Sequence, residues 1–90
     1  MKTVPLSLLA HWAGGELQGE DIVIDAMTND TRSLLPDSLY VAVRGERFDG
    51  HDFATDAVAR GAVALLVERL LDQPGVAQVL VEDSERALAR

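Results

Sequence analysis

The sequence contains no cysteine and few aromatic residues, which make up 4% of its 90 residues. Without cysteine, the chain can form no disulfide framework, no thiolate nucleophile and no zinc site with cysteine ligands. The scarcity of aromatic side chains means that the core must be built from leucine, valine, isoleucine and alanine. It also argues against stacking along the bases of a nucleic acid.

Basic residues are scarce as well, because eight Lys and Arg stand against fifteen Asp and Glu, for a formal net charge of -7. Such a surface repels a phosphate backbone or an anionic membrane, so neither is an expected partner. The apolar run at residues 6–10 stops at His11 and is too short for a signal peptide or a membrane span. We therefore expect a cytoplasmic domain without membrane insertion.

The amino-terminal third of the chain is predicted to form a helix followed by two strands. Ser7 is a candidate cap for the helix and Gly14 a candidate end, since glycine commonly follows a last helical turn. The apolar residues at helical spacing between them are Leu8, Leu9, Trp12 and Ala13. Residues 16–19 and 22–27 have the pattern of short strands on either side of a Gly-Glu-Asp turn, which predicts a hairpin or meander.

A strand–helix–strand crossover is predicted in the middle of the chain. Residues 39–43 and 63–67 are apolar runs of the kind found in strands buried on both faces. The helix between them has Asp49 or Asp52 available at its start and Gly61 after its last turn. Its apolar face consists of Phe53, Ala54, Ala57 and Val58. Such a crossover makes its two strands parallel.

The carboxyl-terminal part adds a strand at 77–81 and the start of a helix capped by Asp83 or Ser84. These elements together predict an α/β domain: a small mixed sheet that contains a βαβ crossover, with helices packed on the sheet.

Two polar loops, at residues 28–32 and 44–47, flank the predicted strand at 39–43. Ligands of open α/β sheets bind beyond the carboxyl ends of the strands, and the second loop leaves such an end. The first loop lies beside it if the strand ending at residue 27 runs in the same direction. Backbone amides, the Thr31 hydroxyl and an arginine of these loops could then hold a diphosphate or a uracil-like ring.

An ordinary structural role for the same residues is the alternative. Asp30, Thr31 and Arg32 would then satisfy a tight turn, while Arg47 would be solvated. Gly45 and Gly50 would supply permissive backbone.

His51, which lies between Asp49 and Asp52 in sequence, is a candidate metal ligand or general base. A metal site needs three or four ligands, and the other histidine, His11, lies in the first predicted helix. The pattern therefore favours a histidine at a helix start that bonds back to its loop, and no metal. No Gly-rich loop ending in Lys-Ser or Lys-Thr occurs, so nucleotide hydrolysis within these residues is not expected.

The order of these motifs resembles the amino-terminal domain of the Mur ligases. The segments that carry the resemblance are Thr-Asn-Asp-Thr-Arg at 28–32, Pro36, Leu-Tyr-Val-Ala-Val at 39–43 and Gly-Glu-Arg-Phe-Asp-Gly-His-Asp-Phe at 45–53. Gly-Gly-Glu-Leu at 14–17 and the Gly61-Ala62 junction also match, so the resemblance extends over nearly the whole chain. One departure is Asp37, where the family usually has glycine, so the turn there must avoid or tolerate a positive φ.

The resemblance implies a three-domain, ATP-dependent amide ligase of peptidoglycan synthesis. Residues 1–90 would be its amino-terminal domain, which binds the UDP end of the substrate, while ATP and magnesium would bind in the absent middle domain. This chain alone would not be catalytic. Its partners would be UDP-N-acetylmuramoyl-tripeptide and the remaining domains of the ligase.

Matching positions imply roles for individual residues. Those assigned to the UDP moiety are Asn29, Thr31, Glu46, Arg47 and Phe48. Those assigned to support of the loops are Asp30, Arg32, Gly45, Asp49, Gly50 and His51.

Asp-Thr-Arg and Gly-Glu-Arg-Phe-Asp are most similar to ligases that add D-alanyl-D-alanine to the tripeptide. The sibling ligases that add the third amino acid of the peptide are an alternative. A stand-alone domain that binds a protein partner through its acidic face is another.

Overall fold

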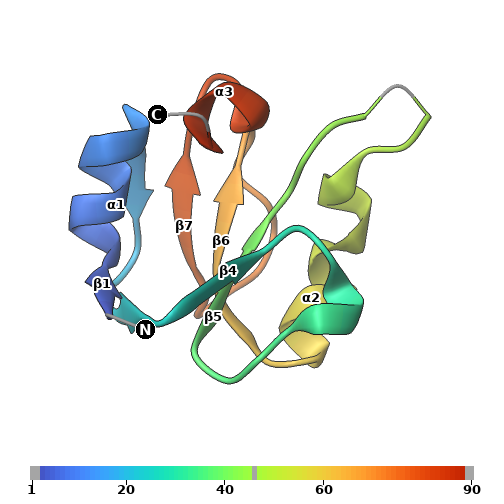
Figure 1. The fold of residues 1–90 in the computed structure, drawn as a ribbon, viewed down its shortest axis with the longest axis horizontal. Coiled ribbons are helices and arrows are strands. Elements are labelled where there is room, and N and C mark those ends of the chain that lie inside the picture. The colour runs from blue at the N-terminus through green and yellow to red at the C-terminus, as the bar shows by residue number, and fades with distance from the viewer. Residues whose placement is uncertain (1–2, 46, 89–90) are drawn as a thin grey trace.

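The computed structural model describes residues 3–45 and 47–88, which form a five-stranded sheet with helices on both faces (Figure 1). The strands are β2 (Glu16–Gln18), β4 (Ala26–Thr28), β5 (Ser38–Val41), β6 (Ala62–Val67) and β7 (Ala77–Leu80), in the spatial order β2-β7-β6-β5-β4. Strands β4, β5, β6 and β7 are parallel to one another, and β2 is antiparallel to β7. The predicted mixed α/β sheet is therefore confirmed. A small second sheet pairs β1 (Val4–Pro5) with β3 (Val23–Ile24).

The central strand β5 is buried on both faces, as its apolar sequence predicts. Leu39 and Val41 point into one core and Tyr40 and Ala42 into the other, because side chains alternate along a strand. From β5 the chain passes through a 3₁₀ turn, η2 (Gly50–Phe53), and helix α2 (Ala54–Ala59) to the parallel strand β6. This is the predicted βαβ crossover.

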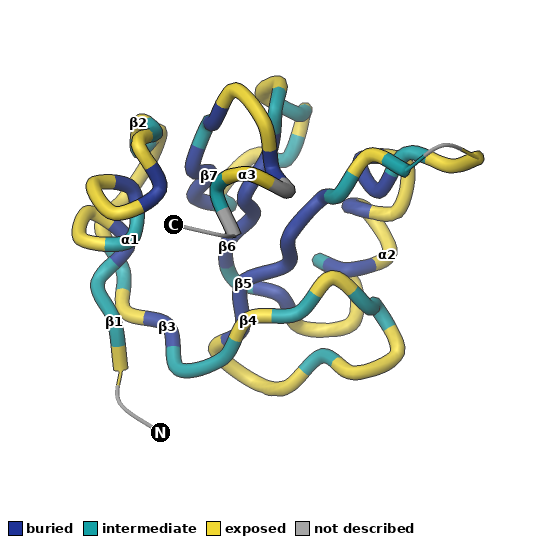
Figure 2. Tube along the Cα trace, turned by 45° about the horizontal axis from the view of Figure 1, so that its top comes forward, coloured by how far each residue is buried: buried dark blue, intermediate teal, exposed yellow. Residues whose placement is uncertain are grey.

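Helices α1 (Leu6–Ala13) and α3 (Ser84–Leu88) lie on one face of the sheet, and α2 lies on the other (Figure 1). Figure 2 shows that the buried stretches run through β5, β6 and β7, while the connecting loops are mostly exposed. None of the helices within the described ranges has the length and apolarity that a bilayer span requires.

The predicted cap of the first helix is wrong, and its predicted apolar face is correct only for Ala13, which is buried, and for Leu9, which packs against the core. Pro5 occupies the N-cap without a side-chain bond, and the Ser7 amide donates instead to the Asp21 carboxylate, at 2.9 Å. The helix is apolar on nearly every side, so residue spacing alone does not identify the face that packs. The buried residues are Leu6, Ala10 and Ala13. Trp12, by contrast, is 53% exposed.

The predicted hairpin of residues 16–19 and 22–27 is also wrong. Strand β2 pairs with β7, with Leu17 opposite Val79, and the second segment divides at Asp25 into β3 and β4. Gly15 permits the first pairing, because a Cβ there would lie 2.4 Å from the Leu80 carbonyl oxygen. Pairing between distant segments thus overrides the local turn signal.

The turn before β5 contains a residue other than glycine in the left-handed backbone region that favours glycine. Asp37 has φ of 57°, in the left-handed region, and its carbonyl accepts a hydrogen bond from the Asp25 amide at 3.1 Å. Aspartate tolerates this region better than most residues other than glycine, so the turn tolerates the positive φ at Asp37.

We predict that Asp37→Val destabilises the fold by about 1–2 kcal/mol, because a β-branched side chain is strained at this φ. The matched variant Asp37→Gly should lie within about 1 kcal/mol of the parent chain, since relief of strain offsets the greater freedom of glycine in the unfolded state. Urea unfolding followed by circular dichroism measures both. Equal stability of the valine variant and the parent chain would contradict the prediction.

Candidate functional site

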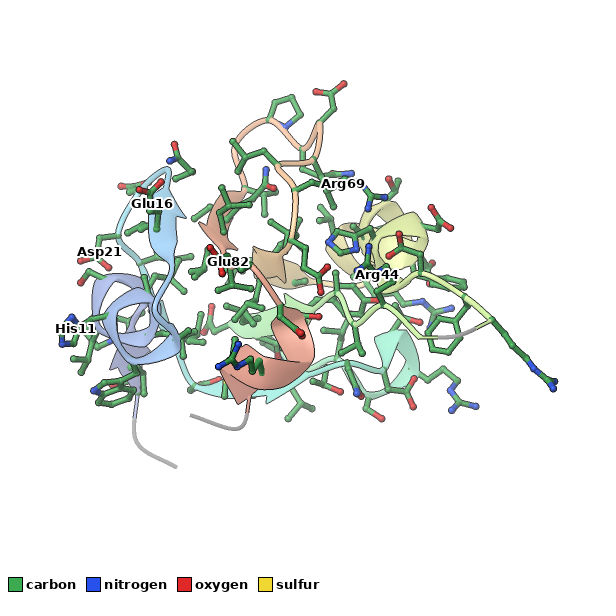
Figure 3. The ribbon with its side chains drawn as sticks, turned by 90° about the horizontal axis from the view of Figure 1, so that it is seen from above. His11, Glu16, Asp21, Arg44, Arg69 and Glu82 are labelled. Atoms are coloured by element: carbon green, nitrogen blue, oxygen red, sulfur yellow. The ribbon has the colours of Figure 1, made fainter. Side chains whose placement is uncertain are left out.

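The carboxyl-terminal edge of the parallel strands carries the candidate site. Strands β4, β5, β6 and β7 run in the same direction, and the segments that leave β5, β6 and β7 reach the upper part of Figure 1, while the turn after β4 lies lower, at the right. Figure 3 looks down on this edge and shows Arg44 and Arg69 near each other, on the opposite side from His11 and Glu16. Ligands of open α/β sheets bind at such an edge.

The loop after β4 is closed by contacts among its own residues. The Thr28 hydroxyl oxygen accepts a hydrogen bond from the Asp30 amide at 3.0 Å. The Asp30 carboxylate accepts bonds from the backbone amide, Nε and Nη2 of Arg32, at 2.9, 3.0 and 3.0 Å. The Arg32 side-chain bonds lower the pKa of Asp30 and raise that of Arg32. Residues Thr31–Ser33 form the short 3₁₀ turn η1 that follows.

Two polar side chains in this loop are not used by these contacts. Asn29 is exposed and Thr31 is partly buried, and neither side chain forms a hydrogen bond with another described residue. Both remain available to a ligand in this part of the structure.

The segment after β5 leaves the sheet and returns as a narrow arm, described for residues 43–45 and 47–50 and seen at the upper right of Figure 1. Arg44 pairs with Asp49 in an antiparallel bridge, and the Gly45 amide donates to the Phe48 carbonyl at 2.9 Å. Glu46, a predicted UDP contact, lies outside the described residues. Phe48 and Arg47 are exposed, and Arg47 has no ion pair with a described residue.

Gly50 anchors the base of the arm to β5. Its amide donates to the Val43 carbonyl at 2.8 Å, and its carbonyl accepts a bond from the buried Tyr40 hydroxyl, also at 2.8 Å. A Cβ at this position would lie 2.7 Å from both the amide nitrogen and the carbonyl oxygen of Val43, so only glycine fits without a backbone shift.

His51 is buried and connects the arm to the end of β6. Its Nε2 accepts a bond from the Glu68 amide at 2.9 Å, which leaves Nδ1 to carry the proton donated to Asp49, at 2.6 Å. With both ring nitrogens engaged, His51 has no atom free to bind a metal. No group of three or more metal-ligating side chains occurs within residues 3–45 and 47–88.

Asp49 accepts hydrogen bonds from several donors at the base of the arm. It accepts bonds from the backbone amide of His51 at 3.0 Å, from the His51 ring, and from Arg69 Nη1 at 3.1 Å. These donors, the backbone amide of His51 foremost, hold the pKa of Asp49 well below its usual range. The carboxylate is therefore ionised wherever the protein is folded near neutral pH.

Glu68 links the arm to the last helix. Its Oε2 accepts bonds from the amide and the hydroxyl of Ser84, at 3.0 and 2.9 Å, and its Oε1 lies 3.7 Å from Arg44. Sequence reasoning assigned no site role to Glu68 or Arg69. Their position directly after a strand predicted to be parallel was the one signal that could have identified them.

The structure places the two polar loops apart. No hydrogen bond or ion pair joins residues 28–33 to the arm in the described part of the chain, and η2 with α2 lies between them in both ribbon and tube views (Figures 1 and 2). Leu34, just after η1, packs against the cluster that contains Ala54 and Ala57 of α2. Any ligand that touches both loops must therefore pass across η2 and α2.

Comparison with known proteins identifies related sequences. Residues 23–90 match the family described as "Mur ligase family, catalytic domain". The UDP-N-acetylmuramoyl-tripeptide–D-alanyl-D-alanine ligase of Escherichia coli is 54% identical over 87 residues, which cover 97% of this chain and 19% of that protein. The UDP-N-acetylmuramoyl-L-alanyl-D-glutamate–2,6-diaminopimelate ligase of Geobacillus kaustophilus is 45% identical over 85 residues, which cover 93% of this chain and 17% of that protein.

Solved structures give the same result. A crystal structure of MurF from Acinetobacter baumannii matches with a TM-score of 0.87 and 30% identity, over 98% of this chain and 20% of that one. MurF from Thermotoga maritima in complex with ADP matches with a TM-score of 0.60 and 35% identity, over 71% of this chain and 15% of that one. The chain thus spans a fifth or less of the length of each of these proteins.

Asp49 should make the stability of the fold sensitive to acid. A carboxylate whose pKa is lowered by folding stabilises the native state above its unfolded pKa, near 3.8, and this contribution is lost as the pH falls below that value. We predict that Asp49→Asn lowers the free energy of unfolding by about 1–2 kcal/mol at pH 7 and that the difference shrinks below pH 4. Urea titrations at pH 7, 5, 4 and 3 measure this.

Asp52→Asn is the matched control, because it makes the same charge change on an exposed neighbour. Its stability should follow that of the parent chain at each pH. Identical pH profiles for the two variants would contradict the role assigned to Asp49.

Proposed function

Because this chain belongs to the Mur ligase family, we propose that it is the amino-terminal, UDP-binding domain of a ligase that adds D-alanyl-D-alanine to UDP-N-acetylmuramoyl-tripeptide. The observation that carries the proposal is the 54% identity to a ligase of that specificity, which extends over 97% of this chain. Since the chain covers 19% of that relative, the ligase activity belongs to the larger protein and the chain contributes substrate binding.

The contacts within the loops support a division of roles. Asp30, Arg32, Asp49 and His51 bond to one another or to the sheet, and Gly50 is confined by Val43. Asn29, Thr31 and Arg47 form no such bonds with the described residues, and Phe48 is 59% exposed. We assign the first group to holding the loops and the second to contacting the uridine and the diphosphate. Glu46 is retained in the second group on sequence grounds alone.

Arginine suits the diphosphate, because its planar fork can donate two charge-assisted hydrogen bonds to phosphate oxygens. The Thr31 hydroxyl and the Asn29 amide can donate to phosphate or to the polar edge of a base. Binding at the UDP end is remote from the peptide carboxylate that reacts. Its contribution to the ligation is to hold the substrate so that the reacting end is oriented in the rest of the enzyme.

The residues of this chain do not fit ATP or magnesium. The sequence has no Gly-rich loop ending in Lys-Ser or Lys-Thr, and the described residues offer no group of metal-ligating side chains. We place both cofactors in the other domains of the ligase and assign no bond-forming step to this chain. The relative crystallised with ADP supports nucleotide use in the family. We propose that the enzyme, like its nucleotide-linked substrate, is cytoplasmic.

The sibling ligase that adds the third amino acid is the second candidate, and 45% identity to a diaminopimelate-adding enzyme favours it. An acceptor assay on the full-length protein separates the two, since the proposed ligase should consume D-alanyl-D-alanine and not a single amino acid. Membership of the family leaves no support for a stand-alone acidic interaction domain.

We predict that Arg47→Ala raises the KM for UDP-N-acetylmuramoyl-tripeptide roughly 10- to 100-fold in the full-length ligase, because a charge-assisted hydrogen bond to phosphate is lost. Thr31→Ala should raise it roughly 2- to 10-fold, as expected for a neutral bond. The KM values for ATP and for the acceptor should not change. Steady-state kinetics with each substrate varied in turn measure these constants.

Arg86→Ala is the control, because Arg86 is an exposed arginine on α3, which packs on the opposite face of the sheet from α2. Its variant should keep the parent KM. Unchanged substrate KM in both the Thr31 and the Arg47 variants would overturn the assignment of the loops.

A further inference from the structure

The large aromatic side chains are distributed against the usual pattern. The chain has one Trp, one Tyr and two Phe, and of these only Tyr40 lies in the core, at 2% exposure. Phe48 is 59% exposed and Phe53 is 46% exposed. Phenylalanine is normally among the more buried residue types. Two half-exposed phenylalanines in a small domain therefore indicate a surface that another molecule covers.

Phe48 and Phe53 contact each other on the surface. Their ring centroids are 6.3 Å apart and their planes are inclined at 70°, an edge-to-face arrangement. In such a pair, a third planar ring can lie flat against one phenyl face while it meets the other phenyl ring at an angle. The pair thus has the shape of a corner that can receive one more aromatic ring.

Both rings stand on ordered backbone. Phe48 is held by the bond from the Gly45 amide to its carbonyl, and its ring packs so closely on Gly45 that a Cβ there would lie 3.2 Å from Cε1. Phe53 ends η2 and precedes Ala54, which is 1% exposed in the second core cluster. The rings are therefore positioned before any ligand binds, which limits the entropy lost on binding.

Phe53 also belongs to the element that separates the two polar loops. The arm lies beside η2 and the η1 turn lies beside α2, so the junction of η2 with α2 is on the path between them (Figures 1 and 2). Sequence reasoning treated Phe53 as part of the apolar face of this helix, but the exposed fraction of its side chain shows that it does not pack into the core.

We propose that Phe48 and Phe53 together form a platform on which the nucleobase of the ligand stacks, which makes Phe53 a ligand-binding residue. This proposal rests on the proposed function. It adds a role for Phe53 and gives a chemical reason for an aromatic side chain at that position. Stacking on an aromatic face accepts any flat heteroaromatic ring, while hydrogen bonds from the loops select its edge. The low aromatic content argues against stacking along a nucleic acid, but a single base needs only this pair.

The surroundings of the pair favour a nucleotide over a protein partner. Arg47, adjacent to Phe48, has no ion pair with a described residue and supplies positive charge in a chain with a net charge of -7. Thr31 and Asn29 offer unused polar groups on the loop across α2. A flat ring attached to a negatively charged diphosphate matches this combination of an aromatic corner and an arginine that has no ion pair with the described residues.

The test is the affinity of the full-length ligase for UDP and for pyrophosphate, measured by isothermal titration calorimetry. Phe53→Ala should weaken UDP binding roughly 5- to 100-fold, the range that stacking of one base on one side chain provides. Pyrophosphate has no base, so its affinity should be unchanged. Phe53→Tyr keeps the ring and should keep most of the affinity, whereas Phe53→Leu keeps apolar volume without an aromatic face and should not.

Trp12→Leu is the matched control, because Trp12 is also an exposed aromatic residue, at 53% against 46% for Phe53, and lies on α1. Its UDP affinity should equal that of the parent enzyme. If Phe53→Ala binds UDP within twofold of an active parent enzyme, the platform is overturned and the proposed function stands. Equal losses for UDP and pyrophosphate would also overturn it, because they would indicate a displaced arm. A parent enzyme that neither binds UDP nor ligates would overturn the proposed function itself.

Discussion

Strands β4, β5 and β6 run parallel, and this shared direction decides which loops of the protein can act together. The chain leaves parallel strands at the same edge of the sheet. Two loops that are separated by a whole strand in the sequence therefore both begin at that edge. The crossover that the parallel arrangement requires, η2 and α2, then lies between these loops. The candidate site and the position of Phe53 both follow from that arrangement.

The contacts that hold the two loops differ in strength. The Asp30–Arg32 pair lies on the surface, with 83% of the arginine side chain exposed, and an exposed ion pair typically contributes less than about 1 kcal/mol. The arm depends on stronger interactions, because the His51 ring is buried and bonded through both nitrogens, to Asp49 and to the Glu68 amide. The base of the arm is therefore rigid, while its exposed end, with Arg47 and Phe48, is left to meet a ligand.

The crossover could be predicted from the sequence, because each of its strands is a continuous apolar run and its connection is local. The pairing of β2 with β7 could not be predicted. Leu17 pairs with Val79, which lies far along the chain, and no local sequence pattern indicates such a partner. The packing face of α1 was not predictable either, because apolar residues surround the helix. In the site, Asp30 and Arg32 are two residues apart and can be connected by inspection, whereas Asp49 and Arg69 are 20 residues apart and meet only in the fold.

Hydrogen–deuterium exchange of the full-length protein, with and without the proposed substrate UDP-N-acetylmuramoyl-tripeptide, tests most directly whether these two loops and the segment between them receive the ligand. Slower exchange is expected at residues 28–33 and 44–53 when the substrate is bound, because the ligand covers their amides and restricts their opening. Exchange over α1 should be unaffected. Unchanged exchange in both loops at a substrate concentration that saturates ligation would contradict the proposed site.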